Sequence, residues 1–408
     1  MKLSTWLTKI GAIDPSTIQL GLDRVKKVAE CLGIHPGCPV IIVGGTNGKG
    51  STVATLAAIY QAAGYQTGTF TSPILFKHNE EVRVNGECAS DEEFCAAFAK
   101  IDSARKEILL TPFEFHTLAA FLILQTYALD VWIIEVGLGG RLDAVNILDA
   151  DVAITTSIGI DHTEWLGPTR EEIGYEKSGI YRRAKPAVCG DQKPPLSLIA
   201  YADKIAAPLF VQQADFIFQE TEKEWTWSYG NVSYEHLPRN TLLTQNLSTA
   251  LMTVTLLQPS LPVAEEAIKN GLRGLALPGR IEVIQKNCTE IFDVSHNPAA
   301  VTVLAKYLTK TRSTGNTYAV FSMLADKDIS GSLEVARDCV DGWYAATLAV
   351  KRGASREQLE SAFEAANITR VNFFGTMADA YQAVCKIVRP EDRIVVFGSF
   401  HTVAEVKG

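Results

Sequence analysis

A glycine-rich segment near the amino terminus gives the strongest chemical signal in the sequence. It reads GGTNGKGST at positions 44–52 and follows the apolar run PVIIV at 39–43. A buried strand that feeds such a turn and then opens a helix points backbone N–H groups and the helix dipole at one spot, which favours a phosphate. Lys49 adds a mobile ammonium able to reach the outer phosphates of a nucleotide. The segment therefore predicts a nucleotide site, and the alternative is a glycine-rich turn without a ligand.

The segment departs from the strict phosphate-loop pattern GxxxxGK[ST]. Val43 stands where the first glycine belongs, and Gly50 rather than a hydroxyl residue follows Lys49. In a standard loop that hydroxyl binds Mg²⁺. Ser51 is one residue late, so we expect the hydroxyl ligand from elsewhere. Ser72, in FTSPIL, is a candidate, although its local sequence alone favours a simple turn serine before a proline.

Two further polar residues follow apolar runs. Glu135 lies near the end of VWIIEV (131–136), and His162 follows VAITTSI (152–158). A carboxylate so placed holds a metal or positions water in phosphate-loop enzymes, and a buried carboxylate without partners would be costly. A lone histidine is more often structural. However, Lys49, Glu135 and His162 all follow the carboxyl ends of buried strands, where open α/β sheets bind ligands.

The elements that must position these residues alternate in type. The three apolar runs are typical of strands buried on both faces of a parallel sheet. Capping boxes at Ser90 and Thr169 predict helix starts, and a further helix is expected from about Gly50 to Ala63. Short strands are predicted between 210 and 240. The fold class is therefore α/β, with a mostly parallel sheet.

The chain is predicted to form two domains, because 408 residues exceed the about 250–300 that one core supports. Residues 277–290 look like a connector of turn residues and mixed polarity. A second alternation of predicted strands and helices follows. We expect an ATP-binding phosphate-loop domain over 1–283 and a smaller Rossmann-like α/β domain over 284–408. In the latter, Asp293 ends an apolar run and His296 follows, which suggests a second polar cleft.

Composition limits the classes of partner. The net charge of −8 provides no general field for nucleic acid or for an acidic membrane surface. The eight cysteines form no CxxC pair, so a cysteine zinc site or disulfide framework is not expected. The amino terminus lacks the apolar stretch of a signal peptide, and no run approaches ~18 apolar residues. We expect a cytoplasmic monomer without nucleic-acid or membrane partners.

Ten motifs occur in the order found in one known family. They are GTNGKGS (45–51), TSP (71–73), FEFHTLAAF (113–121), EVGLGGRLDAVN (135–146), DHTEWLG (161–167), EKSGI (176–180), LPGR (277–280), FDVSHNP (292–298), ADKD (325–328) and GSFHTVA (398–404). Over nearly its whole length the chain resembles the Mur-ligase superfamily and, within it, the bifunctional dihydrofolate synthase/folylpolyglutamate synthases.

The resemblance implies an ATP-dependent ligase. ATP would phosphorylate a carboxylate of the pterin substrate to an acyl phosphate, and the amine of L-glutamate would displace the phosphate to form an amide. The expected substrates are ATP, L-glutamate, dihydropteroate and tetrahydrofolates. The alternatives are a folylpolyglutamate synthase only, a cell-wall ligase that uses a UDP-muramoyl peptide, or a phosphate-loop nucleotide-binding module without ligase chemistry.

The resemblance also implies roles for individual residues. ATP-binding positions are Thr46, Asn47, Gly48, Lys49, Gly50, Ser51, Asn246, Arg280 and Asp293. Two Mg²⁺ sites are implied, one at Ser72 and Glu135 and one at His162 and Lys177. Lys177 would be carbamylated, whereas its sequence context without the resemblance predicts a solvated lysine on a helix. His296 and Ser399 would lie near the incoming glutamate. The implied catalytic set is Lys49, His162, Lys177, Asp293 and His296.

Contacts to the pterin are implied for three segments. They comprise Ile18, Gln19 and Leu20, then Thr111, Pro112, Phe113 and Glu114, and finally Leu142, Asp143 and Ala144. The chain departs from the family pattern at Ile74, Pro112, Val145 and Ser178, where histidine, tyrosine, threonine and alanine are usual. Of these departures, Pro112 bears on the pterin contacts.

Overall fold

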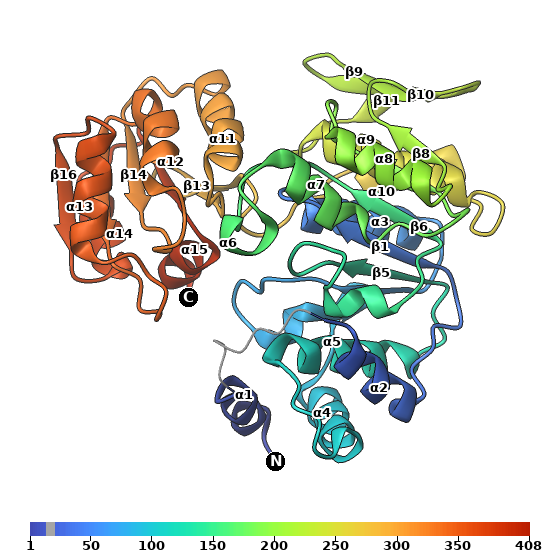
Figure 1. Ribbon diagram of the computed structural model, residues 1–408. Helices are drawn as coiled ribbons and strands as arrows, with labels where there is room; N and C mark the ends of the chain where they lie inside the picture. Colours follow the sequence, from blue (N-terminus) through green and yellow to red (C-terminus); the bar gives the residue numbers. More distant parts are fainter. Residues whose placement is uncertain (14–20) are drawn as a thin grey trace. The chain divides into compact units, whose positions relative to one another are not determined.

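The computed structural model describes residues 1–13 and 21–408. These residues form two compact units, Met1–Leu275 and Ala276–Gly408, which are shown in Figure 1. The predicted pterin contacts at Ile18, Gln19 and Leu20 lie outside the described residues. Within the ranges described, no helix is both long and apolar enough to cross a membrane.

The first unit is built on an eight-stranded sheet with the order β4-β3-β2-β5-β1-β6-β7-β8. The strands are β1 (Val40–Gly44), β2 (Thr67–Phe70), β3 (Val82–Val84), β4 (Glu87–Cys88), β5 (Val131–Glu135), β6 (Val152–Thr155), β7 (Ala187–Cys189) and β8 (Leu209–Val211). Neighbouring strands pair in parallel except for the pairs β2–β3 and β3–β4, which confirms the predicted α/β class. Val43 pairs with Glu135 on β5 and Ile154 on β6, so the residues after these three strands emerge at one sheet edge.

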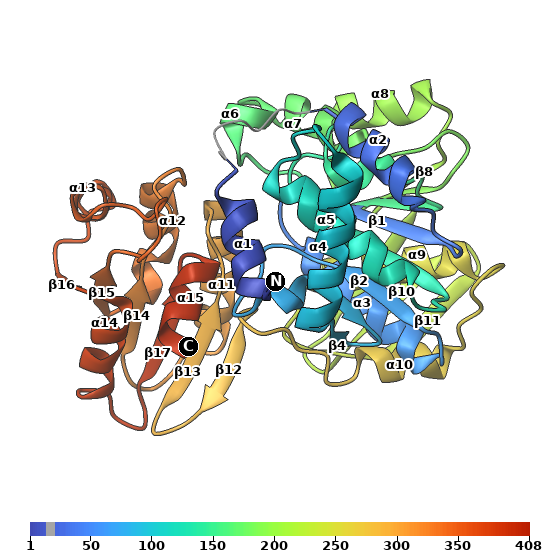
Figure 2. The same cartoon turned by 90° about the horizontal axis from the view of Figure 1, so that it is seen from below.

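Helices cover both faces of this sheet. They are α1 (Leu3–Gly11), α2 (Asp23–Leu32), α3 (Lys49–Ala62), α4 (Asp91–Arg105), α5 (Pro112–Gln125), α6 (Thr163–Leu166), α7 (Arg170–Ser178), α8 (Leu196–Lys204), α9 (Thr244–Leu257) and α10 (Glu265–Leu272), with short 3₁₀ turns η2 (His78–Glu81) and η3 (Ala144–Ile147). Figure 2 shows α5 packed with α2 and α4, while α3 packs with α9 and α10 (Figure 1). The predicted capping boxes at Ser90 and Thr169 are present.

The predicted short strands after residue 210 form two different structures. Residues 209–211 make β8, at the edge of the main sheet. The others form a separate antiparallel sheet of β9 (Phe216–Glu220), β10 (Glu224–Tyr229) and β11 (Val232–Pro238). Trp225 and Trp227 of β10 are buried, so this small sheet has an apolar face.

The second unit contains a six-stranded sheet with the order β12-β13-β17-β14-β15-β16. Its elements are β12 (Glu282–Gln285), β13 (Thr289–Asp293), α11 (Pro298–Lys310), β14 (Thr317–Phe321), α12 (Ile329–Ala336), η4 (Arg337–Cys339), β15 (Gly342–Ala346), α13 (Arg356–Ala365), β16 (Val371–Phe374), α14 (Met377–Cys385), β17 (Arg393–Phe397) and α15 (Phe400–Lys407). Only β12 runs antiparallel to its neighbour, β13.

The predicted connector at 277–290 is in fact largely sheet. It contains β12 and the start of β13, and the predicted boundary between 283 and 284 falls inside β12. The boundary between the two compact units lies earlier, between Leu275 and Ala276. The strand was missed because it is an edge strand with alternating partly buried and exposed residues, which leaves EVIQ with the mixed polarity of a loop.

Candidate active site

The phosphate loop between β1 and α3 is held in shape by residues that follow β6. The backbone N–H of Thr46 donates to the Ser157 carbonyl at 2.7 Å, and that of Asn47 donates to the Ser157 hydroxyl at 3.1 Å. The Thr156 hydroxyl donates to the Asn47 carbonyl at 2.7 Å. Lys49 folds back, with Nζ 3.2 Å from the Gly45 carbonyl. The loop is therefore a preorganised backbone cradle at the predicted sheet edge.

Glycine is required in this loop by close contacts as well as by backbone conformation. Gly48 has φ of 91°, and a Cβ there would lie 2.4 Å from Oδ1 of Asn246 on α9. Asn246, a position that the resemblance assigns to nucleotide binding, is buried and lies directly against the loop. A Cβ at Gly50 would lie 3.6 Å from Oε2 of Glu135. The residue after Lys49 thus faces the carboxylate predicted to hold the metal.

Substitution of Gly48 should weaken nucleotide binding specifically. In Gly48→Ala the new methyl group would displace Asn246 or distort the loop, and we expect ATP affinity to fall by at least about tenfold, or 1.4 kcal/mol. Gly64→Ala is the matched control, because Gly64 also has positive φ (90°) but open space around its Cβ position. Both variants should lose about 1 kcal/mol of stability. Calorimetric titration with ATP measures the difference, and equal affinities in the two variants would contradict this account.

The structure brings together Glu135 and Ser72, the pair that the resemblance implies for one cation. Glu135 is 4% exposed at the end of β5, and the backbone N–H of Ser72 donates to its Oε2 at 3.2 Å. A buried carboxylate beside a hydroxyl residue and a phosphate cradle is a donor set that suits Mg²⁺, which prefers oxygen ligands. The residues present therefore fit the metal that the resemblance implies.

Lys177 is buried, so its interpretation as a solvated helical lysine was wrong. It lies on the inner face of α7 and is 3% exposed. Burial, followed by the positive charge of Lys49, lowers the pKa of Lys177 to about 7, while the carboxylates of Asp161 and Asp143 act in the opposite direction. Charge interaction with Lys49 links Lys177 to the phosphate loop.

His162 follows Asp161 directly and is the N-cap residue before α6, in the left-handed conformation with φ of 51°. Its backbone N–H donates to the Asp161 carboxylate at 2.9 Å. The side chain is 36% exposed, so it is much more accessible than Lys177. Because Asp161 acts electrostatically on Lys177, the three residues belong to one region of the first unit.

The segment Leu142–Ala144 is organised by Asp143. Its buried carboxylate accepts the backbone N–H groups of Leu138 at 2.8 Å and Val145 at 3.0 Å, and the latter bond caps η3. Burial raises the pKa of Asp143 to about 6, against the opposing effect of these bonds. The preceding Arg141 forms an ion pair with Glu176 on α7, with Nη2 and Oε1 2.8 Å apart.

The segment Thr111–Glu114 begins α5. Thr111 and Glu114 form a reciprocal capping box, with Pro112 at the first helical position, where proline is well tolerated. The departure at Pro112 is therefore compatible with the helix start. Arg24 on α2 also donates to Glu114 at 3.0 Å. Phe113 packs on Gly137, since a Cβ at Gly137 would lie 2.4 Å from Cζ of the ring.

In the second unit, Asp293 ends β13 and is 5% exposed. It accepts the backbone N–H groups of Ile281 at 2.8 Å and Ser295 at 2.9 Å, together with the Ser295 hydroxyl. Burial raises the pKa of Asp293, and the positive charge of Arg280 opposes that shift.

Phe400 joins the predicted polar residues of this unit and was not predicted. The Arg280 guanidinium lies over its ring at 5.2 Å, and the His296 ring centroid is 6.3 Å away. Nδ1 of His296 lies 3.0 Å from the Val294 carbonyl, which selects the tautomer protonated at Nδ1. The Ser399 hydroxyl accepts the backbone N–H of Thr402 at 2.9 Å and caps α15. The motif GSFHT drew attention to this turn, but no local signal singled out Phe400.

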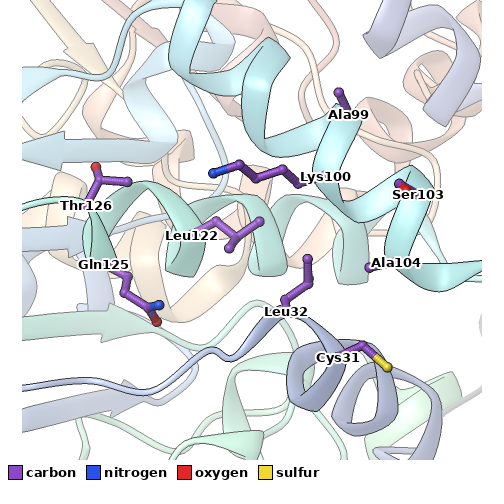
Figure 3. A pocket seen from close by; sticks show the side chains of 9 residues that line it. All are labelled: Cys31, Leu32, Ala99, Lys100, Ser103, Ala104, Leu122, Gln125 and Thr126. Carbon is purple, nitrogen blue, oxygen red and sulfur yellow. The ribbon is translucent and has the colours of Figure 1, made fainter.

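A surface pocket elsewhere in the first unit contains no predicted site residue. Figure 3 shows it between α2, α4 and α5. Its lining residues are Cys31, Leu32, Ala99, Lys100, Ser103, Ala104, Leu122, Gln125 and Thr126. The pocket is therefore distinct from the phosphate-loop region.

Comparison with known proteins agrees with this geometry. Residues 43–204 match the middle domain of the Mur ligases, and residues 279–400 match the Mur ligase glutamate ligase domain. The fold is that of a Mur ligase. Within that class, the chain belongs to the dihydrofolate synthase/folylpolyglutamate synthase family, as predicted.

The alignments with individual relatives cover almost all of this chain and of each relative. The dihydrofolate synthase/folylpolyglutamate synthase of Escherichia coli is 42% identical over 99% of this chain and 94% of its own length, and that of Haemophilus influenzae is 38% identical over 99% and 96%. The structure of E. coli FolC with DHPP and ADP has a TM-score of 0.95 at 41% identity, covering 100% of this chain and 97% of that one. A bifunctional enzyme with Mn, AMPPNP and L-glutamate bound has a TM-score of 0.94 at 40% identity, with the same coverage.

Proposed function

We propose that this chain joins L-glutamate to dihydropteroate in a reaction that cleaves ATP to ADP and phosphate, and that it also adds glutamates to tetrahydrofolates. The proposal rests on the phosphate loop that follows β1 in the first unit. The chain that carries this loop matches a dihydrofolate synthase/folylpolyglutamate synthase over 99% of its length. Solved relatives contain DHPP and ADP in one case, and AMPPNP, Mn and L-glutamate in another.

The reaction needs ATP because a carboxylate is a poor acyl donor. A carboxylate oxygen of the pterin substrate attacks the terminal phosphorus of ATP, and ADP leaves. The glutamate amine then attacks the acyl carbon, inorganic phosphate leaves and the amine loses a proton. Phosphoryl transfer requires alignment and charge neutralisation more than covalent help. The loop amides at Thr46 to Ser51 and the ammonium of Lys49 would supply both, and Asn246 would fix the loop against the nucleotide.

Two groups of residues would hold divalent cations. Ser72 and Glu135 form the first group, and His162 with a modified Lys177 forms the second. With a divalent cation bound, the first group would help to neutralise charge on the phosphate oxygens and to fix their orientation. In the second unit, Arg280 and Asp293 would contact the nucleotide, and His296 and Ser399 would receive glutamate.

Carbamylation of Lys177 is supported by its surroundings. Carbon dioxide reacts with a neutral amine, and a pKa of about 7 leaves a large neutral fraction under physiological conditions. A buried ammonium beside Lys49 is electrostatically unfavourable. The carbamate is an anion, so the modification would turn this repulsion into attraction and provide oxygen ligands for a cation.

The pterin would lie near the start of α5 and the turn after β5. Phe113 and Gly137 are in contact there, and Asp143 fixes the Leu142–Ala144 turn beside them. The segments Thr111–Glu114 and Leu142–Ala144 are proposed as the pterin-binding walls, together with residues 18–20. Pro112 preserves the helix start, so we expect dihydropteroate binding to be retained.

A parallel assay of dihydropteroate and tetrahydrofolate, each with L-glutamate and MgATP, tests the proposal. We expect the purified chain to glutamylate both substrates. We also expect it to be a monomer, which light scattering measures. Turnover of tetrahydrofolate alone would reduce the function to folylpolyglutamate synthesis, and turnover of a UDP-muramoyl peptide instead would place it among cell-wall ligases. Slow ATP hydrolysis that ignores glutamate, and that survives replacement of Asp293 and His296 by alanine, would indicate a nucleotide-binding module.

A further inference from the structure

Three residues with metal-binding side chains meet in the first unit outside the proposed ATP site. His78 and Glu81 lie one turn apart on η2, and His116 lies on α5. Nδ1 of His116 is 3.3 Å from Oε1 of Glu81, and Nδ1 of His78 is 3.7 Å from Oε2 of the same carboxylate. One ligand atom from each residue lies within 4.8 Å of the other two.

The cluster is enclosed by aromatic side chains. His78 and Glu81 are each 8% exposed, and the His78 ring lies 4.6 Å from the rings of both Phe94 and His116. Among residues 1–13 and 21–408, Nε2 of His78 and Oε2 of Glu81 are buried atoms without a hydrogen-bond partner. A buried carboxylate is costly unless its charge is compensated. Oε2 of Glu81, which faces Nδ1 of His78, therefore has unused ligand capacity where a cation would relieve an energetic cost.

The spacing matches a small tetrahedral ion. Ligand atoms that share Zn²⁺ at about 2.1 Å lie about 3.4 Å from one another. Each imidazole Nδ1 lies close to that distance from one oxygen of the Glu81 carboxylate, at 3.3 Å for His116 and 3.7 Å for His78, and the three-residue set spans no more than 4.8 Å. Two imidazoles and one carboxylate form a three-ligand set that leaves a fourth position for water.

We propose that His78, Glu81 and His116 form a binding site for a divalent transition metal of the Zn²⁺ class. Imidazole nitrogens favour zinc, cobalt, nickel and copper over magnesium, so this site differs in selectivity from the oxygen-rich set at Glu135. A bound ion would link η2 to α5. The carbonyl of Glu81 also accepts the backbone N–H of Thr71 at 2.9 Å, so the ion would indirectly brace the segment that presents Ser72.

Cobalt binding in the presence of excess Mg²⁺ tests the site, because Co²⁺ replaces Zn²⁺ and gives visible absorption bands. Metal-free full-length protein is saturated with MgADP and titrated with CoCl₂. We expect one equivalent to bind with nitrogen and oxygen ligation. His116→Ala and Glu81→Gln should each weaken binding by more than the roughly 10–100-fold caused by loss of an outer-shell partner. His35→Ala, which removes an exposed histidine, should bind like the wild type.

A stability readout separates metal loss from misfolding. Zn²⁺ should raise the melting temperature of the wild type and of His35→Ala, but not that of either cluster variant, while far-ultraviolet circular dichroism shows that all fold. His162→Ala removes a residue of the cation site proposed at His162 and Lys177. If cobalt binds at His78, Glu81 and His116 instead, this variant should retain the cobalt bands. Three results would overturn the proposal: no cobalt binding by the wild type in excess Mg²⁺, undiminished binding in both cluster variants, or bands that show only thiolate ligation.

Discussion

Glu135→Gln should abolish ligase turnover, with a loss of roughly a thousandfold or more, while the protein remains folded. The substitution keeps the shape of the side chain and removes the charge. Glu135 is buried at the end of β5, beside the Ser72 backbone N–H and facing Gly50 of the phosphate loop. The neutral amide would therefore lose affinity for the cation that aligns the phosphates. Initial rates of dihydrofolate formation at saturating MgATP measure the effect.

Glu290→Gln is the matched control. Glu290 is also a buried strand glutamate, on β13 of the second unit, where Lys286 and Tyr381 contact its carboxylate. Its substitution should lower stability modestly and leave turnover within a few-fold of the wild type. Near-normal activity of Glu135→Gln would contradict the metal assignment. A melting temperature far below that of Glu290→Gln would instead assign the carboxylate a mainly structural role.

Lys177→Ala should also eliminate most activity, by roughly a hundredfold or more, and short-chain carboxylates should restore part of it. The truncation leaves a buried space beside Lys49, where an acetate or propionate ion can take the place of the carbamate. Activity is measured with and without added carboxylate at constant ionic strength. Lys185→Ala serves as the control, since Lys185 is an exposed lysine paired with Asp151 and should show no carboxylate effect.

The pH dependence gives a second test of Lys177. Carbamylation needs the neutral amine, so bicarbonate stimulation of the wild type should increase as pH rises through about 7. The folded-state pKa is lowered from 10.5, so the unmodified lysine weakens stability progressively as pH falls from 10.5 to about 7. In buffer free of carbon dioxide, Lys177→Met should therefore melt higher than the wild type at pH 7, with a smaller gap near pH 10. An unmodified wild-type mass and no bicarbonate response would exclude the carbamate.

Local sequence signals located the first unit's polar residues because Glu135 ends a buried strand, and Lys49 and His162 lie in the segments that follow two others. Buried parallel strands are continuous apolar runs, so the ends of β1, β5 and β6 could be recognised, and with them Lys49, Glu135 and His162. Lys177 was different. In REEIGYEKS the only apolar residue on the buried face with Lys177 is Ile173, so the amphipathic pattern was too weak to show the burial that the fold imposes.

The second unit was less predictable because its site is assembled by long-range pairing. β17 inserts between β13 and β14, which brings Phe400 beside Arg280 and His296 from more than a hundred residues away in sequence. No local pattern specifies that order. Similarly, the His78–Glu81–His116 cluster joins η2 to α5, and His116 by itself is an ordinary residue of an apolar helix.

The most direct test of the account follows labelled oxygen through one reaction. Dihydropteroate carrying heavy oxygen in its carboxylate is incubated with the enzyme, L-glutamate and MgATP, and both the phosphate and the pterin product are analysed by mass spectrometry. The account predicts one inorganic phosphate per dihydrofolate, with each phosphate carrying one labelled oxygen, and no release without glutamate beyond a slow background. Phosphate without label, or ATP hydrolysis at the same rate without pterin and glutamate, would contradict it.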